Sequence, residues 1–306
     1  MTATARDLGM VGLALLRFLR HRLAVASALV LAVMAVLSLA APLVESALGV
    51  DASAVDLLDR FAPPSTGHLL GTDELGRDLL VRLLYGGQVS LFVGLTAALV
   101  SMIVGTLVGL TAGYHGGRFD ALLMRLTDGV ISLPLLPLLI VLAAVDLGKL
   151  GIPETIAQSE SVSLYRIVVI VALVGWTTVA RLVRGATLGL REREFVLAAR
   201  SQGAGSLRIM AVHILPNLVS PIVVATTLSV GQVILLESVL SFLGLGIQPP
   251  LPSWGNLLTN AQELIWSAPA LAFYPGILIF VTVIAFNFLG DGIQDALDPK
   301  GMDNAP

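Results

Sequence analysis

Long apolar runs alternate with shorter polar stretches along the chain, and this alternation predicts membrane-spanning helices. A run of roughly 17–25 mostly apolar residues is long enough to cross the hydrocarbon core of a bilayer as a helix. Six such runs occur, at residues 23–44, 89–112, 121–145, 167–183, 220–236 and 271–289. The sequence therefore predicts an all-α, polytopic membrane protein with six transmembrane helices.

The first apolar run has two possible interpretations. The segment 38–41, Ser-Leu-Ala-Ala, loosely resembles the cleavage site of a signal peptide. The run before it is longer than the apolar core of a signal peptide, which favours a retained helix. We therefore assign residues 1–22 to a basic N-terminal tail in the cytoplasm and residues 23–48 to the first transmembrane helix.

Residues 49–87 are predicted to be extracytoplasmic and to end in an amphipathic helix on the membrane surface, residues 68–87. Thr72 or Asp73 can cap such a helix, and Glu74 suits its positive end. Leucines recur at helical spacing along it. Two oppositely charged pairs are spaced four residues apart, namely Asp73 with Arg77 and Asp78 with Arg82.

Residues 88–293 form the predicted five-helix core. The run at residues 89–112 carries small residues that let helices approach closely in lipid, at Gly94, Ser101, Gly105 and Gly109. In the next run, Pro134 and Pro137 predict kinks.

The most polar interruption of the second half is residues 191–216. Its pattern predicts a short helix at residues 192–201, a break at Gly203 and Gly205, and a second helix that fades into the next apolar run. Its four arginines are Arg191, Arg193, Arg200 and Arg208. Two interpretations stay open: an ordinary basic cytoplasmic loop, or a docking site for a soluble protein.

Residues 238–269 contain too many glycines and prolines to span a membrane. They predict short helices folded back at the outer mouth, with Trp254 and Trp266 at the membrane interface. Glu237 is either a charge that snorkels at the end of a span or a contact for substrate. The candidate residues of the mouth are Glu237, Gly244, Gly246 and Trp254.

The basic residues support this topology. Of the 18 lysines and arginines, thirteen fall in segments predicted to be cytoplasmic and five in segments predicted to be outside. Cytoplasmic loops carry such an excess. Both termini are therefore predicted inside, with residues 294–306 as a cytoplasmic tail.

Composition narrows the possible activities. The chain has 306 residues, of which 56% are hydrophobic and 13% charged, and it has no cysteine, which excludes thiolate metal sites and thiol nucleophiles. It has no glycine-rich loop of the Walker type, and its four histidines are dispersed, so neither nucleotide hydrolysis nor a metal site is expected within the chain. The middle thirds of the spans carry no ionisable residue, so the energy for any transport must come from elsewhere.

Three stretches resemble those of a known family. The segment GTDELGRD resembles a segment of peptide and nickel importer permeases, and LSFLGLGIQPPLPSWG resembles a segment of peptide permeases. The polar segment resembles the EAA loop of the membrane subunits of ATP-binding-cassette importers through Ala198, Ala199, Gly203, Leu215 and Pro216. Leu197 stands where that loop has an acidic residue, and His213 where isoleucine is common. Glu194 lies one helical turn before Ala198 and keeps a carboxylate near that face.

The resemblance implies the MetI-like fold of type I importer permeases and the C-type subunit of a dipeptide, oligopeptide or nickel importer in the bacterial plasma membrane. It implies no catalytic residue and no cofactor in this chain, because ATP and Mg²⁺ are used by partner ATPase subunits. The implied partners are a homologous second permease, two ATPases and an extracytoplasmic binding protein. Peptide is the first expectation for the cargo and nickel the alternative. The alternative from a different functional class is a membrane scaffold or channel without an energy source.

Overall fold

The computed structural model describes residues 10–157 and 159–297 of the chain. The first nine residues and residues 298–306, parts of the two predicted cytoplasmic tails, lie outside the described residues. The described part is helical and contains no named strand. Its α-helices are α1 Met10–Arg20, α2 Arg22–Leu39, α3 Ala41–Leu48, α4 Leu79–His115, α5 Gly117–Ser132, α6 Leu135–Ala143, α7 Glu154–Ala157, α8 Glu160–Leu190, α9 Glu194–Ser201, α10 Ser206–Arg208, α11 Leu215–Phe242, α12 Ala261–Leu264 and α13 Ala270–Leu297.

Five helical stretches of the described part are long and apolar enough to cross a membrane. The stretches are Arg22–Leu39, Leu79–His115, Ser161–Leu190, Ser206–Phe242 and Ala270–Leu297. The pair α5 and α6 gives a sixth if it counts as one broken span, because its two halves meet at 86°. The predicted polytopic helical fold is confirmed, with the third predicted span broken rather than kinked.

The break in that span follows from one of the two predicted prolines. Pro134 supplies no backbone N–H, and it drives the preceding residue, Leu133, into extended geometry (φ −76°, ψ 138°). Pro137 lies in the first turn of α6, where a helix does not need an N–H. Only Pro134 therefore ends a helix.

The surface helix predicted at residues 68–87 begins only at Leu79, as the start of α4. Asp78 caps α4 by accepting from the N–H of Val81 at 2.9 Å, and α4 then runs for 37 residues without a break. Before it, the carboxylate of Asp73 accepts from the N–H groups of Leu75 and Arg77 at 2.8 and 3.0 Å, which closes a turn instead of starting a helix. Residues 79–87 are thus the first turns of the second span.

The predicted ion pairs of this region are only partly present. Asp73 pairs with Arg77 at 2.8 Å. The expected Asp78–Arg82 pair is absent, because Arg82 lies 3.2 Å from Asp73 and Asp78 lies 3.0 Å from His68. The buried carboxylate of Asp73 therefore holds both arginines.

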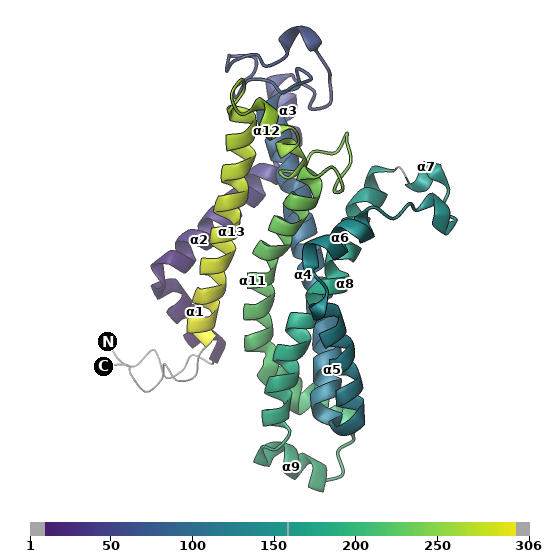
Figure 1. The fold of residues 1–306 in the computed structure, drawn as a ribbon. Helices are drawn as coiled ribbons and strands as arrows, with labels where there is room; N and C mark the ends of the chain where they lie inside the picture. The colour runs from purple at the N-terminus through teal and green to yellow at the C-terminus, as the bar shows by residue number, and fades with distance from the viewer. Residues whose placement is uncertain (1–9, 158, 298–306) are drawn as a thin grey trace, which may run out of the picture.

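The first predicted span is also shorter than expected. Helix α2 ends at Leu39, and α3 begins at Ala41 with Pro42 in its first turn. Helix α2 packs against α13 and α4, and it borders one side of the bundle (Figure 1).

Helices α4 and α8 form the tightest pair of the bundle, and small residues allow it. A Cβ atom at Gly105 would lie 2.6 Å from the carbonyl oxygen of Trp176, and one at Gly113 would lie 2.9 Å from that of Arg184. Gly109 meets the carbonyl of Ala180 even more closely. The predicted close packing of the second span is confirmed, and α8 is its partner.

The two ends of the bundle differ. One end carries residues 49–78 and α12, and the opposite end carries α9 (Figure 1). We call them the loop end and the α9 end.

Candidate functional site

The α9 end is built around a small hydrophobic cluster. Val196 of α9 is fully buried, and it joins Ile209, Met210 and Ile214 of the following helical segment. Val179 and Val183, on the cytoplasm-predicted half of α8, complete the cluster with Leu110, Leu218 and Ile222. The predicted helix, break and second helix of residues 191–216 are therefore folded onto the ends of α4, α8 and α11.

Gly203 forms the break as expected. Its φ is +81°, a conformation that glycine adopts without strain. Its N–H donates to the carbonyl of Arg200 and the N–H of Ala204 donates to that of Ala199, each at 3.0 Å, which ends α9 in the usual glycine-terminated way. Gly203 is exposed, and no atom lies within 4 Å of the position that a Cβ would take.

The second helix begins irregularly. Residues Ile209–Ile214 form a π-helical turn between α10 and α11. Pro216, in the first turn of α11, supplies no N–H to the turn before it, and such turns occur where the regular ladder is interrupted. Leu215 packs against the hydrophobic cluster, while Pro216 is exposed.

The two alanines of the polar segment face different ways. Ala198 is exposed, whereas Ala199 is 8% exposed and packs inside the chain. Of the two alanines that carry the resemblance to the EAA loop, only Ala198 is therefore open to a partner. The exposed face of α9 combines Ala198 with Glu194, Phe195 and Leu197.

Two of the four arginines hold the segment in place. Arg191 donates to the carbonyl of Gly113 at 3.0 Å, and the guanidinium of Arg200 lies 5.8 Å from the ring centroid of Tyr114. Both contacts join the segment to the last turns of α4. Next to them, Arg184 makes a double hydrogen bond to Asp120 at 2.5 and 2.6 Å, which fixes α8 to α5. The segment is therefore joined directly to α4, and a neighbouring ion pair joins α8 to α5.

Glu237 lies inside the protein rather than at an outer mouth. Its side chain is fully buried, so neither the snorkelling nor the substrate-contact expectation matches its position. Ser241 donates to Oε1 at 2.7 Å, and Ser90 of α4 donates to Oε2 at 3.2 Å. The buried carboxylate joins α11 to α4.

The same serines hold the segment that follows α11. The N–H of Ile247 donates to Oγ of Ser241, and the N–H of Trp254 donates to Oγ of Ser90, both at 3.1 Å. Gly246 passes so close to Ser241 that a Cβ would lie 2.5 Å from its Cα. Gly244 adopts a φ of +75° in open space. The segment is pinned to the bundle through the Glu237 cluster, which we define as Glu237, Ser90 and Ser241.

The two tryptophans of this segment behave differently. Trp254 is 1% exposed, packs on Gly86 and Gly87 of α4, and donates through Nε1 to the carbonyl of Leu83 at 3.0 Å. Trp266 is 93% exposed. The expectation of an interfacial Trp254 is wrong; its ring serves as the anchor of residues 243–260 on α4.

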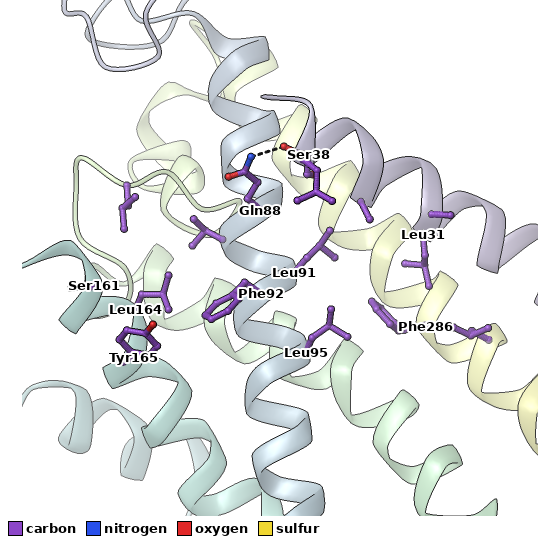
Figure 2. Close-up of a pocket in the computed structure, with 16 residues that line it drawn as sticks. Leu31, Ser38, Gln88, Leu91, Phe92, Leu95, Ser161, Leu164, Tyr165 and Phe286 are labelled. Carbon is purple, nitrogen blue, oxygen red and sulfur yellow. Dashed lines mark hydrogen bonds between the residues drawn. The ribbon is translucent and has the colours of Figure 1, made fainter. Parts of the chain in front are cut away.

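A large groove lies between α2 and the core helices α4, α8 and α13. Its volume is about 870 Å³, and its side chains are mostly apolar (Figure 2). Figure 2 shows Gln88 reaching across from α4 to the carbonyl of Ser38, a hydrogen bond of 2.7 Å. The other labelled residues with polar side chains are Ser38 on α2, and Ser161 and Tyr165 on α8. The groove offers few hydrogen-bond partners for its volume.

Three of the four histidines contact different parts of the fold. His21 lies 3.5 Å from Asp295, His68 pairs with Asp78, and His115 bonds its own helix. Over the described ranges, no group of three or more His, Asp or Glu residues is placed to hold a metal ion.

Comparison with known proteins identifies the family. Residues 105–301 match the model of the family described as binding-protein-dependent transport system inner membrane component. Residues 9–64 match the N-terminal transmembrane domain of oligopeptide transport permease C.

Several proteins resemble the chain over most of its length. The oligopeptide transport system permease protein OppC of Bacillus subtilis (strain 168) is 36% identical over 94% of this chain and 88% of its own. The dipeptide transport system permease protein DppC of the same strain is 40% identical over 93% and 84%. The glutathione transport system permease protein GsiD of Pectobacterium atrosepticum is 40% identical over 93% and 89%.

A solved structure shares the fold. The MetNI methionine ABC transporter, in an inward-facing conformation, contains a chain that matches with a TM-score of 0.57 and 18% identity. The match covers 71% of this chain and 96% of that one. With the helical bundle and the folded α9 segment, these matches lead to one conclusion. The chain belongs to the binding-protein-dependent transport system inner membrane component family, as a multi-pass membrane permease of the oligopeptide permease C type.

Proposed function

We propose that this chain is the permease subunit of an ATP-driven importer that moves dipeptides and oligopeptides across the bacterial plasma membrane. The observation that carries the proposal is α9, a short helix that is held at one end of the bundle by Val196 and leaves Phe195 and Leu197 exposed on its other face. Relatives of this chain are named as oligopeptide, dipeptide and glutathione permeases, and glutathione is itself a small peptide.

In this proposal, the α9 end faces the cytoplasm and receives the ATPase subunits. Glu194, Phe195, Leu197 and Ala198 form the docking face. The four residues Ala199, Gly203, Leu215 and Pro216 shape the segment that presents this face. Glu194 stands in for the acidic residue that the EAA loop of the family has at the position of Leu197.

The remaining partners follow from the same proposal. A homologous second permease completes the pathway, and an extracytoplasmic binding protein delivers the cargo at the loop end. Two ATPase subunits bind ATP and Mg²⁺ and hydrolyse the nucleotide, so this chain is not itself an enzyme. Both termini lie in the cytoplasm.

The proposal is tested by transport. The complex of both permeases and both ATPases is reconstituted in vesicles and given the binding protein with radiolabelled dipeptides, tripeptides or nickel. ATP-dependent uptake of peptide is the expected result. ATP-dependent uptake of nickel alone would favour the alternative cargo, and flux without ATP would favour the channel.

A further inference from the structure

A second, smaller cavity lies where α5 ends and α6 begins. Its volume is about 200 Å³, and it lies between that break and the helices α4, α8 and α11. Ser101 and Gly175, which line the cavity and pack directly against each other, are near the middle of α4 and α8 respectively. In Figure 1, α6 turns away from the line of α5 at this level. We call this space the break cavity.

Within the described residues, three polar side chains of the break cavity make no hydrogen bond, one of them buried and two exposed. The hydroxyl of Ser101 is buried, with 2% of the residue exposed, and makes no hydrogen bond. The other two, Thr178 on α8 and Gln232 on α11, also line the cavity, but they are exposed residues. The neighbouring Thr177 and Ser229 instead donate to carbonyls of their own helices at 2.9 and 2.7 Å.

The break in the backbone lies at the same place. The last four carbonyls of a helix have no donor in its regular ladder; in α5 that of Gly129 accepts from the hydroxyl of Ser132 at 2.8 Å and that of Val130 from the N–H of Leu133 at 3.3 Å. Ile131 and Leu133 line the cavity. Pro134 and Pro137 cannot supply the missing N–H groups. At membrane depth, unsatisfied polar groups and irregular backbone are tolerated where they face a cavity rather than lipid. Broken helices of this kind form substrate sites in other transporters.

The chemistry of the wall selects a neutral ligand. Its lining residues carry hydroxyls and one carboxamide, and none of them is charged. A peptide group carries one N–H donor and one carbonyl acceptor whatever its side chains are. The volume is below the roughly 300–1,000 Å³ of pockets that enclose drug-sized ligands, so the cavity holds one part of a peptide at a time.

We propose that the break cavity is a contact site for the peptide backbone during translocation, in which Thr178 and Gln232 hydrogen-bond to a passing peptide group. The inference rests on the proposed peptide transport. Such a site would accept peptides with different side chains, because the N–H and carbonyl groups that it binds are common to every peptide. The larger groove of Figure 2 lacks this density of free polar groups.

The test compares a dipeptide with its analogue in which an ester replaces the peptide bond and so removes the N–H. The wild-type complex and the Thr178→Val/Gln232→Leu variant are reconstituted with ATPases and binding protein. Thr178→Val is nearly isosteric, Thr178→Ser restores the hydroxyl, and Thr96→Val is the matched control. Thr96 is on α4, bonds the carbonyl of Phe92 at 2.6 Å and does not line the cavity.

The expected result is that the wild type takes up the peptide with a KM about two- to tenfold below that of the ester, the range that one hydrogen bond supplies. That preference is lost in the double variant, reduced in Thr178→Val, and kept in Thr178→Ser and Thr96→Val. If the double variant does not assemble, the single variant Thr178→Val decides. The inference is wrong if the double variant keeps the preference of the wild type, or if its uptake of the peptide and of the ester falls by the same factor. Peptide transport by the wild type would still stand in either case. If the wild-type complex takes up no peptide, the proposed function itself fails, and the inference fails with it.

Discussion

At the scale of single residues, the Glu237 cluster explains how the segment after α11 is fixed. The carboxylate is fully buried and receives hydroxyl donors from two helices. The serines that donate to it also accept from the backbone of residues 247 and 254. A buried carboxylate requires such partners, because an unsatisfied charged or polar group inside a protein is costly. The cluster therefore sets the position of the loop end relative to α4.

This position predicts the effect of removing the carboxylate. Glu237→Leu leaves the hydroxyls of Ser90 and Ser241 buried without their acceptor, at a cost of about 1–3 kcal/mol. Thermal unfolding of the purified complex should begin at a lower temperature than in the wild type, and Glu237→Gln, which keeps an acceptor, should lie between them. Thr227→Val, which removes a hydroxyl bonded within α11, is the control. Equal unfolding temperatures for Glu237→Leu and the wild type would contradict the structural role.

The burial of Glu237 could not be predicted from the sequence. Its partner Ser90 is 147 residues away, and Trp254 meets the same serine over 164 residues. A carboxylate at the end of an apolar run is usually exposed, and a tryptophan near a span end is usually interfacial. Only the packing of α4 on α11 shows that both side chains are inside.

At the scale of elements, the sequence predicts regular helices better than their ends. Apolar runs and prolines were sufficient to predict the spans and the bend at Pro134. The start of α4 could not be predicted in this way, because Asp73 closes a turn on its own backbone. Gly76, with a φ of +75°, crosses the backbone of Asp56 so closely that any side chain there would collide with it. A contact between segments so far apart in the sequence leaves no periodic pattern of apolar residues, so it could not be predicted.

The end of α9 provides a test at this scale. Gly203 has a positive φ and room for a side chain, so backbone strain is the main penalty of a substitution. Gly203→Val should cost about 1–2 kcal/mol at the helix end, whereas Gly203→Asn should cost less, because asparagine tolerates this conformation. Hydrogen exchange of the amides of residues 203–204 should be faster in the valine variant. Equal exchange rates in both variants would show that Gly203 does not control the end of α9.

At the scale of the whole molecule, the bundle has two different ends. The loop end carries the pinned segments around Trp254 and Asp73, and the α9 end carries the arginines that bind α4. The distribution of basic residues predicts that the α9 end is cytoplasmic.

Single cysteines test this orientation, and the chain has none of its own. Ser65, at the loop end, and Ser206, next to α9, are both exposed. Ser65→Cys should react with an impermeant thiol reagent in intact cells, and Ser206→Cys only after the membrane is opened. Labelling of both positions from the same side would rule out the proposed topology.

The central claim is that α9 couples this permease to ATPase subunits, and Ala198→Glu tests it most directly. Ala198 is on the exposed face of α9, so glutamate there should leave the chain folded but place an unpaired charge in the packed contact with the ATPase. Such a charge commonly costs several kcal/mol. Ala199→Glu is a poorer test, because Ala199 is buried within the chain itself. Ala54→Glu, at an exposed alanine of the loop end, is the matched control.

The measurement is copurification of the ATPases with the permease, together with hydrolysis of ATP stimulated by peptide and binding protein. The account predicts that Ala198→Glu reaches the membrane in normal amounts but loses the ATPases or the stimulation. It predicts that Ala54→Glu keeps the ATPases. Normal assembly and normal stimulation in Ala198→Glu would mean that α9 is not the docking site.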